Sequence, residues 1–168
     1  WNQGGTFTME NGAEISDVYG RALYSEDGGK SEINGVISRI TPVYNANFQE
    51  YKRATDGTGF AGIAVFEDAS SEVTLGPSGR ICDITTSKRT DAVLFLWHAS
   101  KFSMENGSEI SDITEVGIVD CDGNNSVSID GKIADCDLKN VAIRFRGNDN
   151  HFNLLENGII TNCATSDE

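Results

Sequence analysis

The 168-residue sequence predicts an all-β fold, a single-stranded parallel β-helix of about six three-strand turns, and three observations support this prediction. Residues 9–17 (MENGAEISD) recur almost unchanged as residues 104–112 (MENGSEISD), and weaker copies of the same unit fill the rest of the chain. Such self-similarity marks a repeat architecture. Apolar residues within each copy alternate with polar ones, as in β-strands, and no helical periodicity is found. Because a unit of three short strands cannot cover its own apolar face, we expect successive units to stack with parallel hydrogen bonding.

Each unit is expected to contain three strands. The first carries an apolar pair that recurs as Phe7/Met9, Ser31/Ile33, Val73/Leu75, Phe102/Met104, Val127/Ile129 and Phe152/Leu154. The second begins at Ile15, Ile37, Ile81, Ile110, Ile133 and Ile160. The third corresponds to residues 22–24, 63–66, 92–95, 117–119 and 141–143, and it is missing from the sixth copy. We expect one domain over residues 1–168, with right-handed connections between its parallel strands.

Acidic and amide side chains recur two residues after the isoleucine of the second strand. This slot holds Asp17, Arg39, Asp83, Asp112, Asp135 and Asn162. Asp and Asn tolerate left-handed backbone geometry, so the slot predicts a tight bend between two strands. The alternative is a ladder of stacked carboxylates that binds calcium, because carboxylates about 5 Å apart repel one another unless a cation lies between them.

The composition excludes some functions. Asp and Glu total 26 against 13 Lys and Arg, and the net charge of -13 argues against nucleic acid as a partner. The longest apolar run, residues 92–97, is too short for membrane insertion. The chain starts at Trp1, which fits either a processed form or a piece of a longer protein. Both fit an extracellular or cell-surface location.

An inserted loop at about 41–59 interrupts the second copy. Insertions in repeat proteins emerge on one face and often bind partners. This loop contains the aromatic residues Tyr44, Phe48 and Tyr51 and the basic residues Lys52 and Arg53. Aromatic rings beside basic groups suit a carbohydrate or protein contact, so these five residues are the candidate binding site. The alternative is a loop that covers part of the helix.

Two further candidate sites are visible. Asp120, Asp122 and Asn124 resemble the start of a calcium-binding loop, although the same residues also suit an ordinary turn. Cys136 and Cys163 occupy the same slot of adjacent copies, where stacked Cα atoms about 4.8 Å apart would allow a disulfide. The alternative is that both are small buried apolar groups.

The pattern of residues 7–16 (FTMENGAEIS) and 102–111 (FSMENGSEIS) resembles the right-handed parallel β-helix repeats of the pectin-lyase-like superfamily, especially adhesin-like surface proteins of bacteria and archaea. The resemblance covers essentially the whole chain and concerns architecture. Many enzymes of that superfamily cleave acidic polysaccharides, but the Asn-Thr-Asp, Asp-Asp, Gly-His-Gly and Arg-Ile-Lys motifs of its polygalacturonase-like members do not occur here. We therefore expect no catalytic residues and no enzyme activity.

A β-helix has open sheet edges at both ends, which need a partner or a cap. The expected function is therefore a non-catalytic extracellular structural or adhesive subunit, which assembles end to end into a surface filament, sheath or stalk. The expected partners are copies of the chain itself or adjoining domains at the open ends. The alternative is a carbohydrate-binding or polysaccharide-cleaving β-helix.

Overall fold

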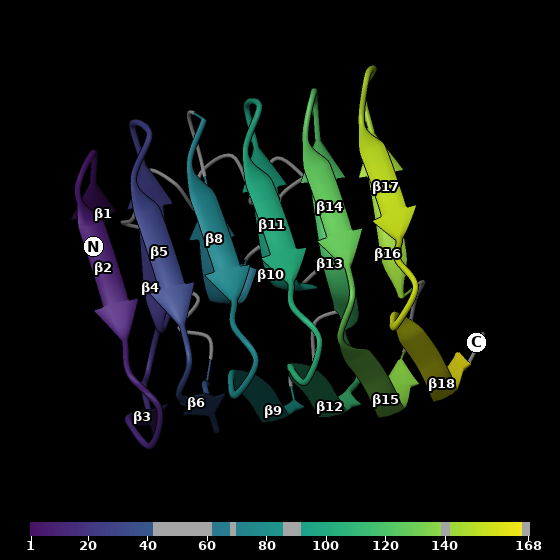
Figure 1. Cartoon of the computed structure of the whole chain (residues 1–168). Helices are drawn as coiled ribbons and strands as arrows, with labels where there is room; N and C mark the ends of the chain where they lie inside the picture. Colours follow the sequence, from purple (N-terminus) through teal and green to yellow (C-terminus); the bar gives the residue numbers. More distant parts are fainter. Residues whose placement is uncertain (42–61, 68–69, 86–91, 139–141, 166–168) are drawn as a thin grey trace.

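The computed structural model describes residues 1–41, 62–67, 70–85, 92–138 and 142–165, and within strand 62–67 it describes the backbone only. These residues form three parallel sheets of six strands each and no helix, which confirms the all-β prediction (Figure 1). In the described ranges we find no helix with the length and hydropathy that crossing a membrane requires.

Every third strand belongs to the same sheet. Sheet A contains β1 (Asn2–Gln3), β4 (Leu23–Glu26), β7 (Gly62–Glu67), β10 (Ala92–Trp97), β13 (Gly117–Asp122) and β16 (Ile143–Arg146). Sheet B contains β2 (Thr6–Met9), β5 (Lys30–Ile33), β8 (Glu72–Leu75), β11 (Lys101–Met104), β14 (Ser126–Ile129) and β17 (His151–Leu154). Sheet C contains β3 (Glu14–Ser16), β6 (Val36–Ser38), β9 (Arg80–Thr85), β12 (Glu109–Thr114), β15 (Lys132–Leu138) and β18 (Ile159–Thr165).

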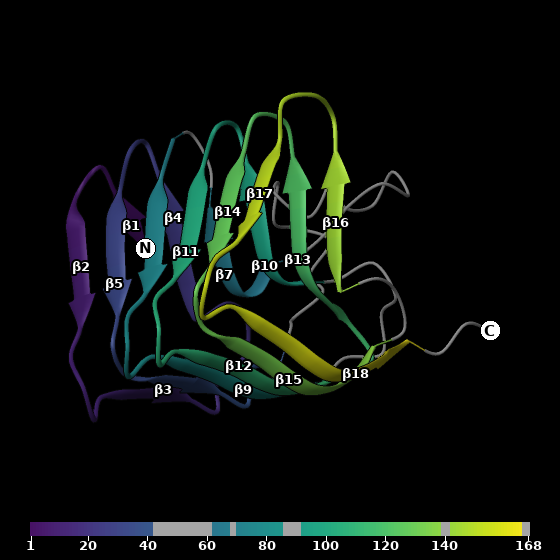
Figure 2. The ribbon, with the colours of Figure 1, turned by 45° about the vertical axis from the view of Figure 1, so that its right-hand side comes forward.

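The chain coils around one axis from the purple N-terminal strands to the yellow C-terminal strands. It passes through sheet A, crosses to sheet B, returns along sheet C and then enters the next strand of sheet A (Figures 1 and 2). In Figure 1 the chain rises at the back, descends at the front and advances to the right, so the coil is right-handed. We call each set of three strands a rung. The first rung is β1–β3 and the last is β16–β18.

The strand register confirms the predicted repeat alignment. In sheet B, Met9, Ile33, Leu75, Met104, Ile129 and Leu154 pair in succession, each with the next. In sheet C, Ile15, Ile37, Ile81, Ile110, Ile133 and Ile160 do the same. Side chains in the middle rungs of these columns, such as Leu75 and Ile110, are fully buried. The two-residue period of the sequence therefore becomes a continuous apolar core along the axis.

Sheet A differs from the prediction at the N-terminus. The first strand, β1, precedes the first recognisable copy of the repeat and pairs with β4 through Asn2 and Ser25. Its core-facing residue is polar: Nδ2 of Asn2 donates hydrogen bonds to Ser25 Oγ at 3.3 Å and to Ser31 Oγ at 3.1 Å. Because the buried amide has these hydrogen-bond partners, its burial costs little free energy. A polar residue at this inward position does not produce the apolar pattern from which a strand is predicted.

The acidic slot has the left-handed backbone that the sequence predicts. All six of its residues have φ between 51° and 56°. The bend does not lie between two strands, however, because Asp83, Asp112, Asp135 and Asn162 lie inside β9, β12, β15 and β18, respectively. The unpaired residue turns the strand while the pairing continues on either side, as Ser111 and Thr114 of β12 show by pairing with Ala134 and Asp137.

Candidate functional site

The last rung exposes apolar side chains that the inner rungs bury. Phe152 is 37% exposed, Leu154 is 51% exposed and Ile160 is 39% exposed, whereas Phe102, Met104 and Ile110 in the same columns are at most 1% exposed. Phe145, Leu155 and Ile159 of the same rung are also exposed. The outer edges of β16, β17 and β18 have no strand partner among the described residues. This C-terminal edge combines apolar surface with free backbone hydrogen-bonding edges, which is the chemistry of an interaction surface.

The first rung forms the opposite edge. β1, β2 and β3 each end their sheet in the described part of the chain. Phe7, Ile15 and Val18 of this N-terminal edge are only partly buried, although they pack against the core. Sequence reasoning predicted two open ends but did not assign exposed residues to them, because exposure at the last rung depends on what lies next to it and not on the repeat pattern.

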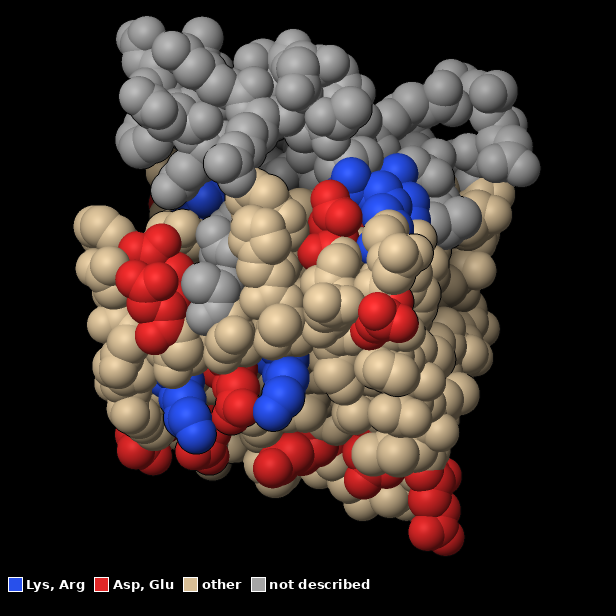
Figure 3. Space-filling view, turned by 90° about the horizontal axis from the view of Figure 1, so that it is seen from above, with Lys and Arg blue, Asp and Glu red and all other residues tan. Residues whose placement is uncertain are grey.

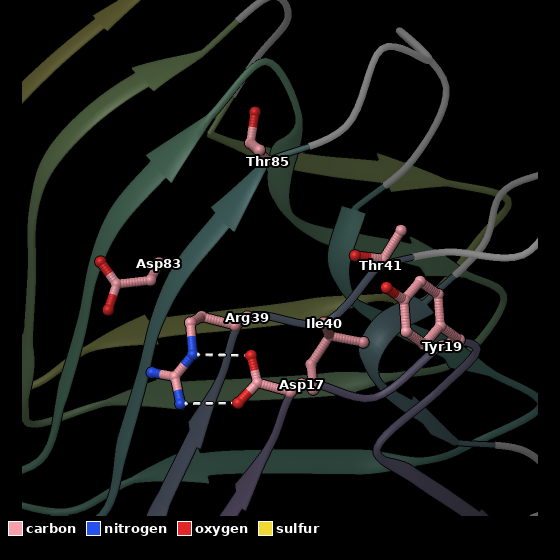
Figure 4. A pocket seen from close by; sticks show the side chains of 7 residues that line it. All are labelled: Asp17, Tyr19, Arg39, Ile40, Thr41, Asp83 and Thr85. Carbon is pink, nitrogen blue, oxygen red and sulfur yellow. Dashed lines mark hydrogen bonds and ion pairs between the residues drawn. The ribbon is translucent and has the colours of Figure 1, made fainter.

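A groove of about 250 Å³ lies beside the first three rungs (Figure 4). Its lining residues are Asp17, Tyr19, Arg39, Ile40, Thr41, Asp83 and Thr85. Tyr19 is 80% exposed and therefore presents its ring to solvent. The backbone beside it is held by hydrogen bonds from Gly20 N to Thr41 O and from Thr41 N to Val18 O, each 2.9 Å long.

Arg39 contributes a positive charge to this groove, and hydrogen bonds hold its guanidinium in place. Its Nε and Nη2 donate to the two carboxylate oxygens of Asp17 at 2.9 and 3.0 Å (Figure 4). Nη2 also lies 3.1 Å from Oε1 of Glu14. The Arg39 guanidinium lowers the pKa of Asp17 below its ordinary value. One member of the predicted carboxylate ladder is therefore neutralised by the arginine in the next rung. At the far end Asn162 Nδ2 donates to Asp135 Oδ1 at 3.0 Å. No group of three or more His, Cys, Asp or Glu side chains suited to a metal occurs in the described ranges, and calcium binding by the slot stays a prediction.

Charged side chains alternate along the outer surface of sheets B and C. Glu72 lies 3.5 Å from Lys30 Nζ and 3.0 Å from Lys101 Nζ. Glu109 similarly lies 2.8 Å from Arg80 and 3.2 Å from Lys132. Figure 3 shows basic and acidic side chains side by side along one edge of the molecule. Each exposed pair contributes only about 0 to 1 kcal/mol, but in-register pairs favour one alignment of neighbouring strands over a shifted one.

The predicted calcium residues have other partners in the structure. Asp120 is 1% exposed, and its carboxylate accepts hydrogen bonds from Arg144 Nη2 at 2.7 Å and from Arg146 Nε at 3.2 Å. Asp122 lies 3.6 Å from Arg146 Nη1. Asn124 is exposed in a left-handed conformation, as expected for a turn. Both arginines come from the next rung, where Arg144 is the register partner of Asp120 and Arg146 is that of Asp122. Calcium at Asp120, Asp122 and Asn124 remains an untested prediction.

Cys136 and Cys163 are register partners on β15 and β18, as the repeat alignment predicts. Both are free thiols: Cys136 Sγ donates to Ala134 O at 3.1 Å, and Cys163 Sγ donates to Thr161 O at 3.3 Å. Burial raises the pKa of Cys136 to about 12, so its nucleophilic thiolate is scarce at neutral pH. In the structure Cys136 is buried and Cys163 is half-buried, and a disulfide between these register partners stays a prediction.

The candidate binding residues Tyr44, Phe48, Tyr51, Lys52 and Arg53 lie outside the described residues. The described chain stops at Thr41 on one side of that segment, and Thr41 lines the groove beside Tyr19.

Comparisons with models of known protein families, with curated proteins and with solved structures found no match for this chain.

Proposed function

We propose that this protein is a non-catalytic structural or adhesive β-helix of the extracellular surface, which joins other copies end to end in a filament, sheath or stalk. The observation that carries the proposal is the C-terminal edge, where Phe152, Leu154 and Ile160 lie exposed in columns that are otherwise buried. The repeat resembles that of adhesin-like members of the pectin-lyase-like superfamily, which supports the same function.

The physical argument starts from the two faces of the stack. An inner rung is stable because it buries apolar side chains against the rungs on both sides and pairs both of its strand edges. The last rung has one such neighbour among the described residues. A further rung supplied by a partner would bury the exposed columns and satisfy the free edges, and contact between unlike ends produces an open filament or a ring.

The test is the size and shape of the purified protein over a concentration series, measured by sedimentation and by negative-stain electron microscopy. We expect particles that lengthen along one axis as the concentration rises. Leu154→Asp places a charge on the apolar edge and should reduce assembly, whereas Thr114→Asp, on the exposed surface of inner strand β12, should leave it unchanged. A protein that stays monomeric at its highest soluble concentration would contradict the proposal.

Carbohydrate binding is the second candidate function, and the groove of Figure 4 favours it. An exposed tyrosine ring beside Arg39, Asp83 and two threonines combines a stacking surface with hydrogen-bonding groups. Titration with a panel of soluble polysaccharides should show weaker binding by Tyr19→Ala than by the wild type. Tyr24→Ala, which removes a tyrosine elsewhere in the molecule, is the matched control. Cleavage of any polysaccharide in the panel would show that the protein is an enzyme.

A further inference from the structure

We infer that the C-terminal edge binds the N-terminal edge of a second copy in one register, with β17 beside β2 and β18 beside β3 of the next molecule. This inference rests on the proposed end-to-end assembly and adds the pair of faces and the alignment. In that register Phe152, Leu154 and Ile160 meet Phe7, Met9 and Ile15 of the second copy, and the apolar columns of sheets B and C continue across the junction.

Equal spacing of the two end rungs allows this alignment. The sheet B strand starts at Thr6 in the first rung and at His151 in the last rung. From these starts the chain reaches the same position in sheet C after the same number of residues, at Val18 and at Cys163, with no insertion in either rung. Both β2 and β17 have four residues. The three contacts in sheets B and C can therefore form together, as they do between neighbouring rungs inside the molecule.

The apolar groups of the two edges complement one another by column. Core-facing positions alternate with surface positions along each strand, so a shift by one residue would place Leu154 opposite a surface threonine of β2. In the inferred register Leu154 instead meets Met9, which continues the column of Leu75, Met104 and Ile129. Val18 of the second copy would likewise lie over Cys163 and cover a half-buried position of the last rung.

The column of slot residues also continues across the junction without repulsion between carboxylates. Asn162 stands at the junction, where it separates Asp135 of one copy from Asp17 of the next, and Asp17 is already neutralised by Arg39 on its other side. A seventh rung of this kind brings no two carboxylates into direct contact at the junction. We assign the edge to a second copy of this chain, because the first rung of the same chain supplies the matching spacing and the matching apolar columns of sheets B and C.

Cysteine crosslinking tests the register. Thr8 and Asn153 are both exposed surface residues on β2 and β17, and the inferred register makes them neighbours across the junction, within disulfide reach. Thr8→Cys protein is mixed with Asn153→Cys protein and oxidised with diamide, which accepts the two electrons and two protons released by disulfide formation. We expect a crosslinked heterodimer, with the bridge between positions 8 and 153 mapped by mass spectrometry. The chain carrying both substitutions should give a ladder of covalent oligomers.

The controls distinguish the alternatives. Thr6→Cys lies two residues away from the inferred contact on the same strand, so its mixture with Asn153→Cys should lose the crosslinked band. Wild-type protein under the same oxidant controls for the four native cysteines. Homodimers of Asn153→Cys alone would show contact between two C-terminal edges and would overturn the inference. Assembly without the 8 to 153 bridge would overturn the register while leaving the proposed function standing, whereas a strictly monomeric protein would overturn both.

Discussion

Leu75 and Leu154 provide the most direct test of the stacked core, because they are the same residue type in the same column of sheet B. Leu75 lies in an inner rung and is fully buried, and Leu154 lies in the last rung and is 51% exposed. Their replacement by alanine removes the same atoms from two environments. The difference between the two losses of stability therefore measures what a neighbouring rung contributes.

The expected magnitudes follow from burial. Removal of the extra leucine carbons costs about 0.8 kcal/mol per buried methylene group, or about 2 to 3 kcal/mol at Leu75. The enclosed cavity left there raises the total to about 3 to 5 kcal/mol. Leu154 is already about half exposed in the native protein, so only about half of this transfer cost applies there. No closed cavity forms at that position, and we expect a loss of stability of about 1 kcal/mol. In a domain of this size these losses correspond to decreases in Tm of roughly 10 °C and about 3 °C.

The assay is urea unfolding of dilute protein followed by circular dichroism, with wild type and both variants at equal concentration. At concentrations where the protein assembles, the cost of Leu154→Ala should rise toward that of Leu75→Ala, because a second copy would then cover the side chain. Equal losses at the two positions in dilute protein would refute the reasoning, since they would mean that Leu154 is as deeply enclosed as Leu75.

Three further predictions concern the slot and the thiols. Asp112→Val should destabilise the protein by about 1 to 2 kcal/mol in urea unfolding relative to Asp112→Asn, because both remove the charge but only valine is strongly disfavoured at φ 55°. Arg39 depresses the pKa of Asp17 below its ordinary value of 3.8, so the ion pair contributes stability above about pH 4 that is lost as the pH falls through the lowered pKa. The stability difference between wild type and Asp17→Asn should therefore shrink in melts recorded below pH 4, and a difference that is constant down to pH 2 would contradict the pair. Cys136, with a pKa raised to about 12, should react with iodoacetamide at pH 8 only after unfolding in urea, and rapid labelling of the native protein would show that the thiol is accessible.

The fold could be predicted from the sequence because every rung repeats the same pattern of apolar, polar and turn residues. Alternation along the strands placed Met9, Leu75 and Leu154 in one column without any knowledge of the coordinates. The slot residues predicted left-handed backbone, since Asp and Asn adopt that conformation more readily than other residues with a side chain. Strand β1 escaped prediction because its inward residue, Asn2, is polar and held by serine hydroxyls.

For the site residues, too, some features follow from the sequence and others only from the tertiary structure. Periodicity and local backbone preference are properties of a few consecutive residues, so the sequence by itself determined the three strands of a unit, their inward faces and the left-handed backbone of the slot residues. It did not determine that four of these residues lie inside a strand. The repeat alignment puts Arg39 in the slot after Asp17, but it does not give side-chain contacts between rungs. Only the tertiary structure decided that Arg39 donates hydrogen bonds to Asp17 and that Arg144 and Arg146 both neutralise the buried Asp120. The exposed apolar edge is likewise a tertiary property. Phe152 and Phe102 have the same place in the repeat, and their burial differs because, among the described residues, Phe102 has a rung on each side and Phe152 has a rung on one side.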